Sequence, residues 1–557
     1  MNQQPVSADA VGFFPQWQSP QQSGGFWFRD IMHNPLPITP MNASFMQPAF
    51  SRGASRAIAQ LSMPITNLQA STHHGYVYLT AAPFEGSPDA VAARFEEMKR
   101  LTMVLGATVL QDWRAIFEPR ILEMAATILS FDYGASSTRA VAQFILTFDE
   151  MMTEVWDIHM RVNIPPMNAV FGFEELLGGI LGPDSLSDGR RLLQGFGNKS
   201  LEMGHALWDL ARWVRAQDGL AETLSLARVR GGRLELLPSP HAGEFERRWQ
   251  AYLETYGWRS DIFFEIGHKS WREDPSSPLM QLKAFIALSD AESPYAKHDS
   301  QVHDRERLEK ELAERLPGEV RPIFHALLPL IQQYVPIAED HNFTIDQKFV
   351  VVTRHGFLQL GHKLVADGQI RDAEDVFFLL FDEIRALAED SAPADFKRAV
   401  RERQQVRLAQ GKLNPPSWLG TQPPADLPPD PLITKFFGLG VAPSTDRKIV
   451  TGNPCSAGTA TGTARVIMSL DQAHRLQPGD ILVCQMTMPA WTPLFGHVSA
   501  VVADSGGPLS HCAIVAREYG IPCVAGTIVG TGTIPDGARI RVDGASGMVH
   551  ILDEARE

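Results

Sequence analysis

The stretch GGPLSHCAIVAREYGIP, residues 506–522, decides how this chain is organised. A glycine pair allows a sharp turn, and the hydroxyl of Ser510 can cap a helix by accepting a bond from a free backbone N–H. A helical run follows, which Gly520 can end in a left-handed conformation and Pro522 cannot continue. The pattern therefore predicts a short helix with His511 in its first turn.

A histidine at this place has a chemical use. The first turn of a helix has unsatisfied N–H groups and the positive end of the helix dipole, which together favour a negative group. An imidazole with an ordinary pKa of about 6.5 is neutral at physiological pH and can take a phosphoryl group on a ring nitrogen. The alternative for His511, as for any of the 17 histidines, is a capping or core residue.

The sequence on both sides of this stretch favours a phosphoryl-accepting role for His511, because it resembles the swivelling phosphohistidine domain of phosphoenolpyruvate (PEP)-utilising and dikinase enzymes. Matching segments follow one another at residues 456–458, 462–466, 478–483, 487–495, 520–522 and 542–547. The resemblance implies that His511 is the phosphocarrier and that Ser510 and Arg517 support it. It also implies a compact β/α domain over residues 447–557.

The bulk composition excludes several classes of protein. A length of 557 residues allows two to four domains, and 44% hydrophobic with 20% charged residues is ordinary for a globular protein. A net charge of −14 without a basic stripe argues against nucleic-acid binding. No apolar run approaches the roughly 20 residues of a membrane span, and no signal-peptide pattern opens the chain, so we expect no membrane partner and a cytoplasmic protein. The four cysteines form no CxxC pair, and we expect no metal on this chain.

The pattern along the chain predicts a multidomain α+β protein. Residues 1–413 form a mainly helical region, opened by an extended, aromatic-rich arm over residues 1–50. A Pro/Gly-rich connector follows at residues 414–446, where Trp418 is expected to anchor part of it to the protein. The swivelling domain completes the chain from residue 447.

The helical region carries a second resemblance, to phosphohistidine-type antibiotic (rifampin-type) phosphotransferases, at residues 192–211, 256–275 and 360–377. In those enzymes this region binds the acceptor. Trp258 stands where the family often has histidine, which favours a more apolar pocket.

Charged and titratable residues in and near these segments suggest roles in transfer. Arg259 and Arg354 are candidates to hold the transferring phosphoryl group, since guanidinium groups match its oxygens. Glu265, His268 or His355 could remove the proton of an acceptor hydroxyl. For each of them the alternative is an ion pair or a structural hydrogen bond.

Neither a P-loop of the form GxxxxGK[ST] nor recognisable ATP-grasp segments occur in the sequence. No (β/α)8 barrel, which needs about 250 residues, follows His511. With a phosphohistidine domain and a helical region but no recognisable ATP-binding segments, the chain resembles the carrier and acceptor subunit of phenylphosphate synthase or 4-methylphenyl (cresol) phosphate synthase. That resemblance implies a heteromer in which a separate ATP-grasp subunit binds ATP and Mg²⁺ and phosphorylates His511, with ATP going to AMP and phosphate.

The expected acceptor is therefore the hydroxyl of a phenolic or other aromatic small molecule, such as phenol or cresol. A phenol, with a pKa near 10 like that of tyrosine, gives up its proton more readily than an alkyl alcohol. Two alternatives use the same carrier chemistry: an antibiotic-inactivating phosphotransferase and a pyruvate- or PEP-related component. A further alternative is a non-catalytic phosphohistidine regulatory protein, and the last is a domain whose histidine is never phosphorylated.

Overall fold

The computed structural model of the chain describes residues 15–17, 19–182, 185–262, 264–391, 395–413, 415–421, 444, 446, 448–468, 470–487, 489–508 and 510–553. Packing divides the chain into two units. Unit 1 consists of Met1–Ala169, Trp258–Ser270 and Ile337–Leu427, and unit 2 consists of Val170–Gly257, Trp271–Pro336 and Pro428–Glu557. The helical region expected over residues 1–413 is shared between the two units. Most of the expected 414–446 connector lies outside the described residues.

Unit 1 contains an antiparallel sheet in the order β2-β3-β1-β6. The strands are β1 (Phe26–Arg29), β2 (Ile65–His73), β3 (Tyr76–Pro83) and β6 (Trp418–Gly420). Strand β1 comes from the aromatic-rich arm, and β6 comes from the start of the connector and pairs Trp418 with Phe28. Trp418 is therefore an anchor of the connector, as the sequence predicts. Aromatic residues suit these strands because they pack well on a half-buried pleated surface.

Helices form the rest of unit 1, and α2 packs directly on β2. Three π-helical turns interrupt or extend these helices, and such turns often occur at functional sites. The α-helices are α1 (Pro20–Ser23), α2 (Gln47–Gln60), α3 (Pro88–Asp112), α4 (Glu118–Ser130), α5 (Thr138–Leu146), α6 (Phe148–Leu181), α14 (Tyr334–His341), α15 (Val350–Ala366), α16 (Phe381–Ala388) and α17 (Lys397–Gln410). The π-turns are η1 (Asn42–Met46), η2 (Trp113–Phe117) and η4 (Asn342–Phe349), and η5 (Ala373–Phe378) is a 3₁₀ helix. The last part of α6 and the start of α14 belong to unit 2.

The helical part of unit 2 is built around α8, which packs against α10, α11 and α12. Its elements are α7 (Ser185–Arg191), α8 (Lys199–Arg215), α9 (Leu220–Leu226), the hairpin β4 (Arg228–Arg230) and β5 (Arg233–Glu235), α10 (Ala242–Tyr256), α11 (Ser276–Ala287), η3 (Asp290–Glu292), α12 (Pro294–Arg315) and α13 (Arg321–Gln332). Apolar residues at helical spacing along α8 form its buried face, as expected for a helix in a packed bundle.

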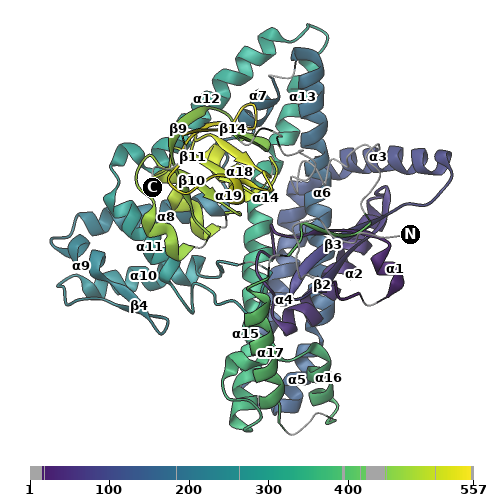
Figure 1. The fold of residues 1–557 in the computed structure, drawn as a ribbon, viewed down its shortest axis with the longest axis vertical. Helices are drawn as coiled ribbons and strands as arrows, with labels where there is room; N and C mark the ends of the chain where they lie inside the picture. The colour runs from purple at the N-terminus through teal and green to yellow at the C-terminus, as the bar shows by residue number, and fades with distance from the viewer. Residues whose placement is uncertain are drawn as a thin grey trace. The chain divides into compact units, whose positions relative to one another are not determined.

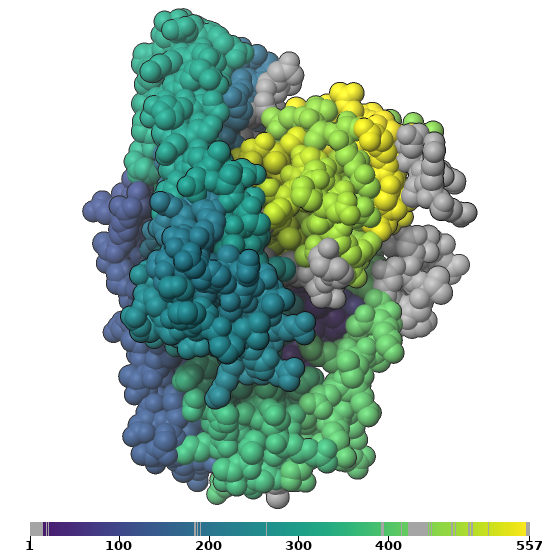
Figure 2. Space-filling view, turned by 90° about the vertical axis from the view of Figure 1, so that its left-hand side faces the viewer, coloured from purple at the N-terminus to yellow at the C-terminus, as the bar shows by residue number. Residues whose placement is uncertain are grey.

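The C-terminal part of unit 2 is an eight-stranded sheet domain in the order β7-β14-β13-β9-β10-β11-β12-β8 (Figure 1). Its space-filling surface, light green to yellow, is a rounded body (Figure 2). The strands are β7 (Ile449–Thr451), β8 (Asn453–Ser456), β9 (Thr459–Val466), β10 (Ile481–Cys484), β11 (Ala500–Ala503), β12 (Cys523–Ala525), β13 (Arg539–Asp543) and β14 (Met548–Asp553). The helical turns are η7 (Leu470–Arg475), η8 (Pro489–Gly496), α18 (His511–Glu518) and α19 (Gly530–Thr533).

The central strands β9 to β12 run parallel, and the flanking strands pair antiparallel. Alternate side chains of β10 and β11 enter two different apolar clusters. Leu482 and Val501 lie on the side of α18, whereas Ile481 and Val502 lie on the side of β13 and β14. A strand buried on both faces reads as a continuous apolar run, which explains the sequence ILVC of β10. The mainly helical region and the β/α domain predicted from the sequence are confirmed.

Two further expectations can be compared with the described residues. All four cysteines are buried and none forms a disulfide. No helix in the described part of the chain combines the length and the hydropathy that a membrane span requires.

Candidate active site

The helix that begins at His511 has the predicted caps. The hydroxyl of Ser510 accepts a hydrogen bond from the backbone N–H of Ala513 at 3.4 Å, and Ser510 has the extended backbone of an N-cap. At the other end, Gly520 has a φ of +64°. His511 is the first residue of α18. Its side chain lies outside the described part of the structure, so its role as phosphocarrier remains a prediction.

Arg517 holds the segment that leads into this helix. Its guanidinium Nη1 donates to the carbonyl oxygen of Pro508 at 2.7 Å and to that of Cys455, in β8, at 2.8 Å. The backbone carbonyl of Arg517 in turn accepts a bond from the Gln301 side chain at 2.9 Å. Arg517 therefore fastens the turn before His511 to the sheet, which is a positioning role.

Two residues near the end of the parallel strands were not singled out from the sequence. Asp504 follows β11, and its carboxylate accepts bonds from the Thr527 hydroxyl and the Thr531 backbone N–H, both at 3.0 Å. Burial raises the pKa of Asp504, and the bonds from Thr531 and Thr527 oppose that rise. Thr487 follows β10, and its hydroxyl is buried without a hydrogen-bond partner among the described residues. The carboxyl ends of parallel strands are where α/β sheets commonly bind ligands. A search for polar residues directly after the predicted strands could therefore have found Asp504 and Thr487.

The four acceptor-site candidates all lie in unit 1, on the loop 258–270 and on α15. Arg259 is buried, and its guanidinium carbon stands 4.8 Å above the ring of Phe343. His268 is half-buried, and its Nδ1 lies 3.1 Å from both the Ser260 hydroxyl and the Lys269 carbonyl. The structure thus places these candidates near one another, with Arg354 bonded to the loop at Ile266, and their roles at an acceptor stay predictions.

Glu265 and Arg354 hold this loop in place. The Glu265 carboxylate accepts bonds from the Thr39 N–H at 2.7 Å, the Thr39 hydroxyl at 2.8 Å and the Gly267 N–H at 2.7 Å. Both carboxylate oxygens are therefore already engaged in holding Thr39 and the loop. Arg354 donates to the Ile266 carbonyl at 3.1 Å and pairs with Glu374 at 2.5 Å.

The remaining base candidate, His355, is on α15 and has its ring 5.9 Å from that of Tyr133. Its neighbour along the helix, Arg354, is buried, whereas His355 is half-buried. Of the three base candidates, Glu265 is the one whose contacts argue against proton abstraction.

The loop 258–270 also carries a strained aromatic residue. Phe264 has a φ of +63°, which is unusual for a bulky side chain and is typical of functional sites. Its ring lies 4.7 Å from that of Trp156 and 4.8 Å from that of His33. The loop is tied to η4 by the backbone N–H of Ser260, which donates to the Gln347 side chain at 2.9 Å.

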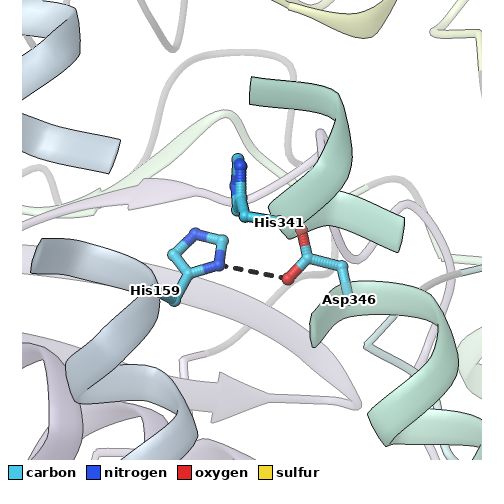
Figure 3. A group of neighbouring side chains, drawn as sticks. All are labelled: His159, His341 and Asp346. Atoms are coloured by element: carbon cyan, nitrogen blue, oxygen red, sulfur yellow. Dashed lines mark ion pairs between the residues drawn. The ribbon is translucent and has the colours of Figure 1, made fainter. Parts of the chain in front are cut away.

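A buried group of titratable residues lies beside this π-turn (Figure 3). It consists of His159 on α6, His341 at the end of α14 and Asp346 in η4. The Nδ1 atom of His159 lies 3.1 Å from Oδ1 of Asp346, and burial lowers the pKa of His341 to about 4. Sequence reasoning missed this group, because its members are far apart in the chain and follow no ligand-spacing motif.

Comparison with known proteins gives two family matches. Residues 159–339 match the rifampicin phosphotransferase fourth domain, and residues 476–547 match the mobile domain of PEP-utilising enzymes. These ranges include the loop 258–270 and α18, respectively.

Relatives extend along most of the chain. Chondramide synthase cmdD of Chondromyces crocatus is 32% identical over 96% of this chain and 14% of its own length. The uncharacterized phosphotransferase YvkC of Bacillus subtilis is 26% identical over 95% of this chain and 62% of its own length. Rifampicin phosphotransferase of Streptomyces sviceus is 28% identical over 78% of this chain and 51% of its own length. The chain therefore spans less than two thirds of each of these proteins. It carries the mobile domain of PEP-utilising enzymes and resembles the rifampicin phosphotransferases.

Proposed function

We propose that this chain is a phosphotransferase component that accepts a phosphoryl group on His511 and passes it to the hydroxyl of an aromatic small molecule, such as a phenol. One observation carries the proposal: a capped helix begins at His511, on a domain that matches the mobile domain of PEP-utilising enzymes. The similarity to rifampicin phosphotransferases supports phosphoryl transfer as the class of reaction.

The proposed reaction has two displacements. In the first, a neutral ring nitrogen of His511 attacks the β-phosphorus of ATP, a P–N bond forms, the phosphoanhydride P–O bond breaks and AMP leaves; water then removes the γ-phosphoryl group as phosphate, so that one phosphoryl group stays on His511. In the second, the acceptor oxygen attacks the same phosphorus, the P–N bond breaks and the hydroxyl proton passes to a base. Positioning and neutralisation of charge, more than covalent chemistry, set the rate of such transfers. The start of α18 supplies backbone N–H groups and a positive dipole end for the phosphoryl charge.

The proposed donor is ATP with Mg²⁺, bound by an ATP-grasp subunit that is separate from this chain. The proposed acceptor region is the part of unit 1 around the loop 258–270. Aromatic rings lie there, and Trp156 and Phe343 are examples. A ring of a phenolic acceptor packs well against such residues.

Intact mass spectrometry tests the carrier step. Wild type, His511→Ala and the control His550→Ala, a half-buried histidine of β14, are incubated with ATP and Mg²⁺, with and without cell extract as a source of the donor subunit. We expect one acid-labile phosphoryl group on wild type and His550→Ala when extract is present, and none on His511→Ala. Phosphate retained on His511→Ala would overturn the assignment of the carrier, and loading by ATP alone would overturn the separate donor.

The acceptor is tested with the phosphorylated chain. Phenol, 4-methylphenol, an alkyl alcohol of similar size and rifampicin are added in turn, and phosphate remaining on the protein is followed with time. We expect discharge to the phenols and not to the alcohol. Discharge to rifampicin alone would support the antibiotic-inactivating alternative, and a chain that stays phosphorylated with every compound would support a regulatory phosphoprotein.

A further inference from the structure

The buried group His159, His341 and Asp346 has the composition of a metal site. The three residues are 7%, 5% and 3% exposed, respectively. One ligand atom from each lies within 4.8 Å of the others. They come from three elements of unit 1, namely α6, α14 and η4, so the fold itself brings them together (Figure 3).

His159 and Asp346 are in close contact, but the two atoms that face each other form no hydrogen bond of acceptable geometry. Nδ1 of His159 and Oδ1 of Asp346 are 3.1 Å apart. Neither atom makes a hydrogen bond of acceptable geometry with any residue that the structure describes, although both are buried. Leaving a buried polar atom without a partner is unfavourable, and a bound water or ion is one way in which such atoms are satisfied. Both lone pairs can be directed at one ion placed between them.

Hydrogen bonds fix the orientation of His341 and Asp346, as is common for metal-binding side chains. Nδ1 of His341 lies 2.7 Å from the Ile337 carbonyl, so it carries the proton and donates, and Nε2 keeps its lone pair. The second carboxylate oxygen of Asp346 accepts a bond from the Asn342 side chain at 3.2 Å. Bonds of this kind fix the ring orientation and the tautomer of metal-binding side chains. The competing contact of His341 is a long one, from the Asn163 amide to Nε2 at 3.4 Å.

We propose that His159, His341 and Asp346 bind one first-row divalent cation, with Zn²⁺ as the first candidate. Two imidazoles and one carboxylate suit zinc and its neighbours in the first row, whereas Mg²⁺ and Ca²⁺ prefer oxygen ligands. Three protein ligands leave at least one coordination position open. If the proposed transfer chemistry holds, that position would take the acceptor oxygen and lower the pKa of its hydroxyl.

The test uses the full chain purified without a polyhistidine tag. Metal content is measured by elemental analysis after dialysis, and Co²⁺ is then titrated into the chelator-treated protein while its visible absorption is recorded. We expect about one zinc per chain and a cobalt spectrum of low-symmetry, tetrahedral type. Wild-type protein that takes up neither ion would overturn the proposal and leave a water-filled polar cluster.

Variants assign the ligands. Asp346→Asn and His341→Ala should lose the metal and the cobalt spectrum, and Asn342→Ala should weaken binding roughly 10- to 100-fold. The control is His362→Ala, an exposed histidine of α15 in the same unit, which should bind as wild type does. Circular dichroism establishes that each variant is folded. Full metal uptake by folded Asp346→Asn and His341→Ala would refute this ligand set.

Phosphorylation of His511 is measured on the same variants. We expect it to be unchanged in Asp346→Asn, because loading of the carrier does not involve unit 1 in the proposed reaction. In the wild-type chain, absence of bound metal with normal phosphorylation would refute the cation site alone, and bound metal without phosphorylation would refute the carrier function alone.

Discussion

A β-carbon placed on Gly506 would lie 2.6 Å from the hydroxyl oxygen of Ser510, the residue that caps the helix of His511. Gly506 also has a φ of +108°, a conformation that side-chain-bearing residues rarely adopt. The turn and the cap are thus packed against each other so closely that only glycine fits. The start of the helix, where the phosphoryl group is proposed to sit, depends on this contact.

Gly506→Ala should therefore lower the rate of His511 phosphorylation and destabilise the C-terminal domain by about 1–3 kcal/mol. The matched control is Gly479→Ala, whose φ is +88° but whose β-carbon would meet nothing within 4 Å. Gly479→Ala should be destabilised by part of the amount expected for Gly506→Ala, and its His511 should be phosphorylated at the wild-type rate. Urea unfolding and the time course of phosphate incorporation measure the two effects. Equal phosphorylation rates in both variants would contradict the proposed dependence.

Glu265→Gln should destabilise unit 1, because an amide has one acceptor oxygen where the carboxylate accepts three bonds from Thr39 and Gly267. We expect a loss of about 1–3 kcal/mol, measured by chemical unfolding. The control Glu150→Gln removes an exposed ion pair with Arg56 and should cost less than about 1 kcal/mol. A variant with unchanged stability but a changed pH profile of acceptor transfer would instead assign Glu265 the role of general base.

Acidification should weaken unit 1 through His73, the last residue of β2. Its pKa is lowered to about 4, chiefly by burial, and its Nδ1 accepts the backbone N–H of Gln16 at 3.0 Å. A protonated ring could not accept that bond. Because the folded pKa lies below the unfolded value of about 6.5, stability is full above pH 6.5 and falls as the pH approaches 4.

The size of this effect is on the order of 1–2 kcal/mol between pH 7.5 and pH 5. It is measured as the difference in urea midpoint between wild type and His73→Gln at the two pH values. The variant should be less stable at pH 7.5 and should show a smaller pH dependence. Parallel pH curves for the two proteins would exclude His73 as the source.

Shortening the connector should slow phosphoryl transfer to the acceptor and spare loading of His511. Strand β6 ends at Gly420 and β7 begins at Ile449, so residues 421–448 could span roughly 90 Å if they were fully polyproline-like. Deletion of residues 423–434 would reduce this reach. Replacing the same residues by an equal number of glycine and serine residues keeps the length and removes the stiffness. Single-turnover transfer rates that match wild type after the deletion would exclude a swinging domain.

The sequence by itself determined the local structure around His511 and the kind of domain that carries it. The carrier role of His511 stays a prediction. The Ser510 cap, the Gly520 end and the apolar runs of the parallel strands depend on neighbours within a few residues, so pattern and propensity suffice to predict them. The order of the short motifs around His511 could also be read from the sequence, because they follow one another within about 110 residues. Arg259, Glu265 and His268 were singled out within the resembling segment 256–275, whereas the closeness of Arg354 to that loop is seen only in the structure.

Only the tertiary structure decided what these residues contact. Nothing near Glu265 in the sequence indicates that Thr39 saturates its carboxylate, and nothing near His159 indicates Asp346 as its neighbour. Such pairs join segments that meet only when helices from distant parts of the chain pack together. The division of the helical region between two units has the same origin, since the apolar stripe of a helix shows that it is buried but not which partner buries it.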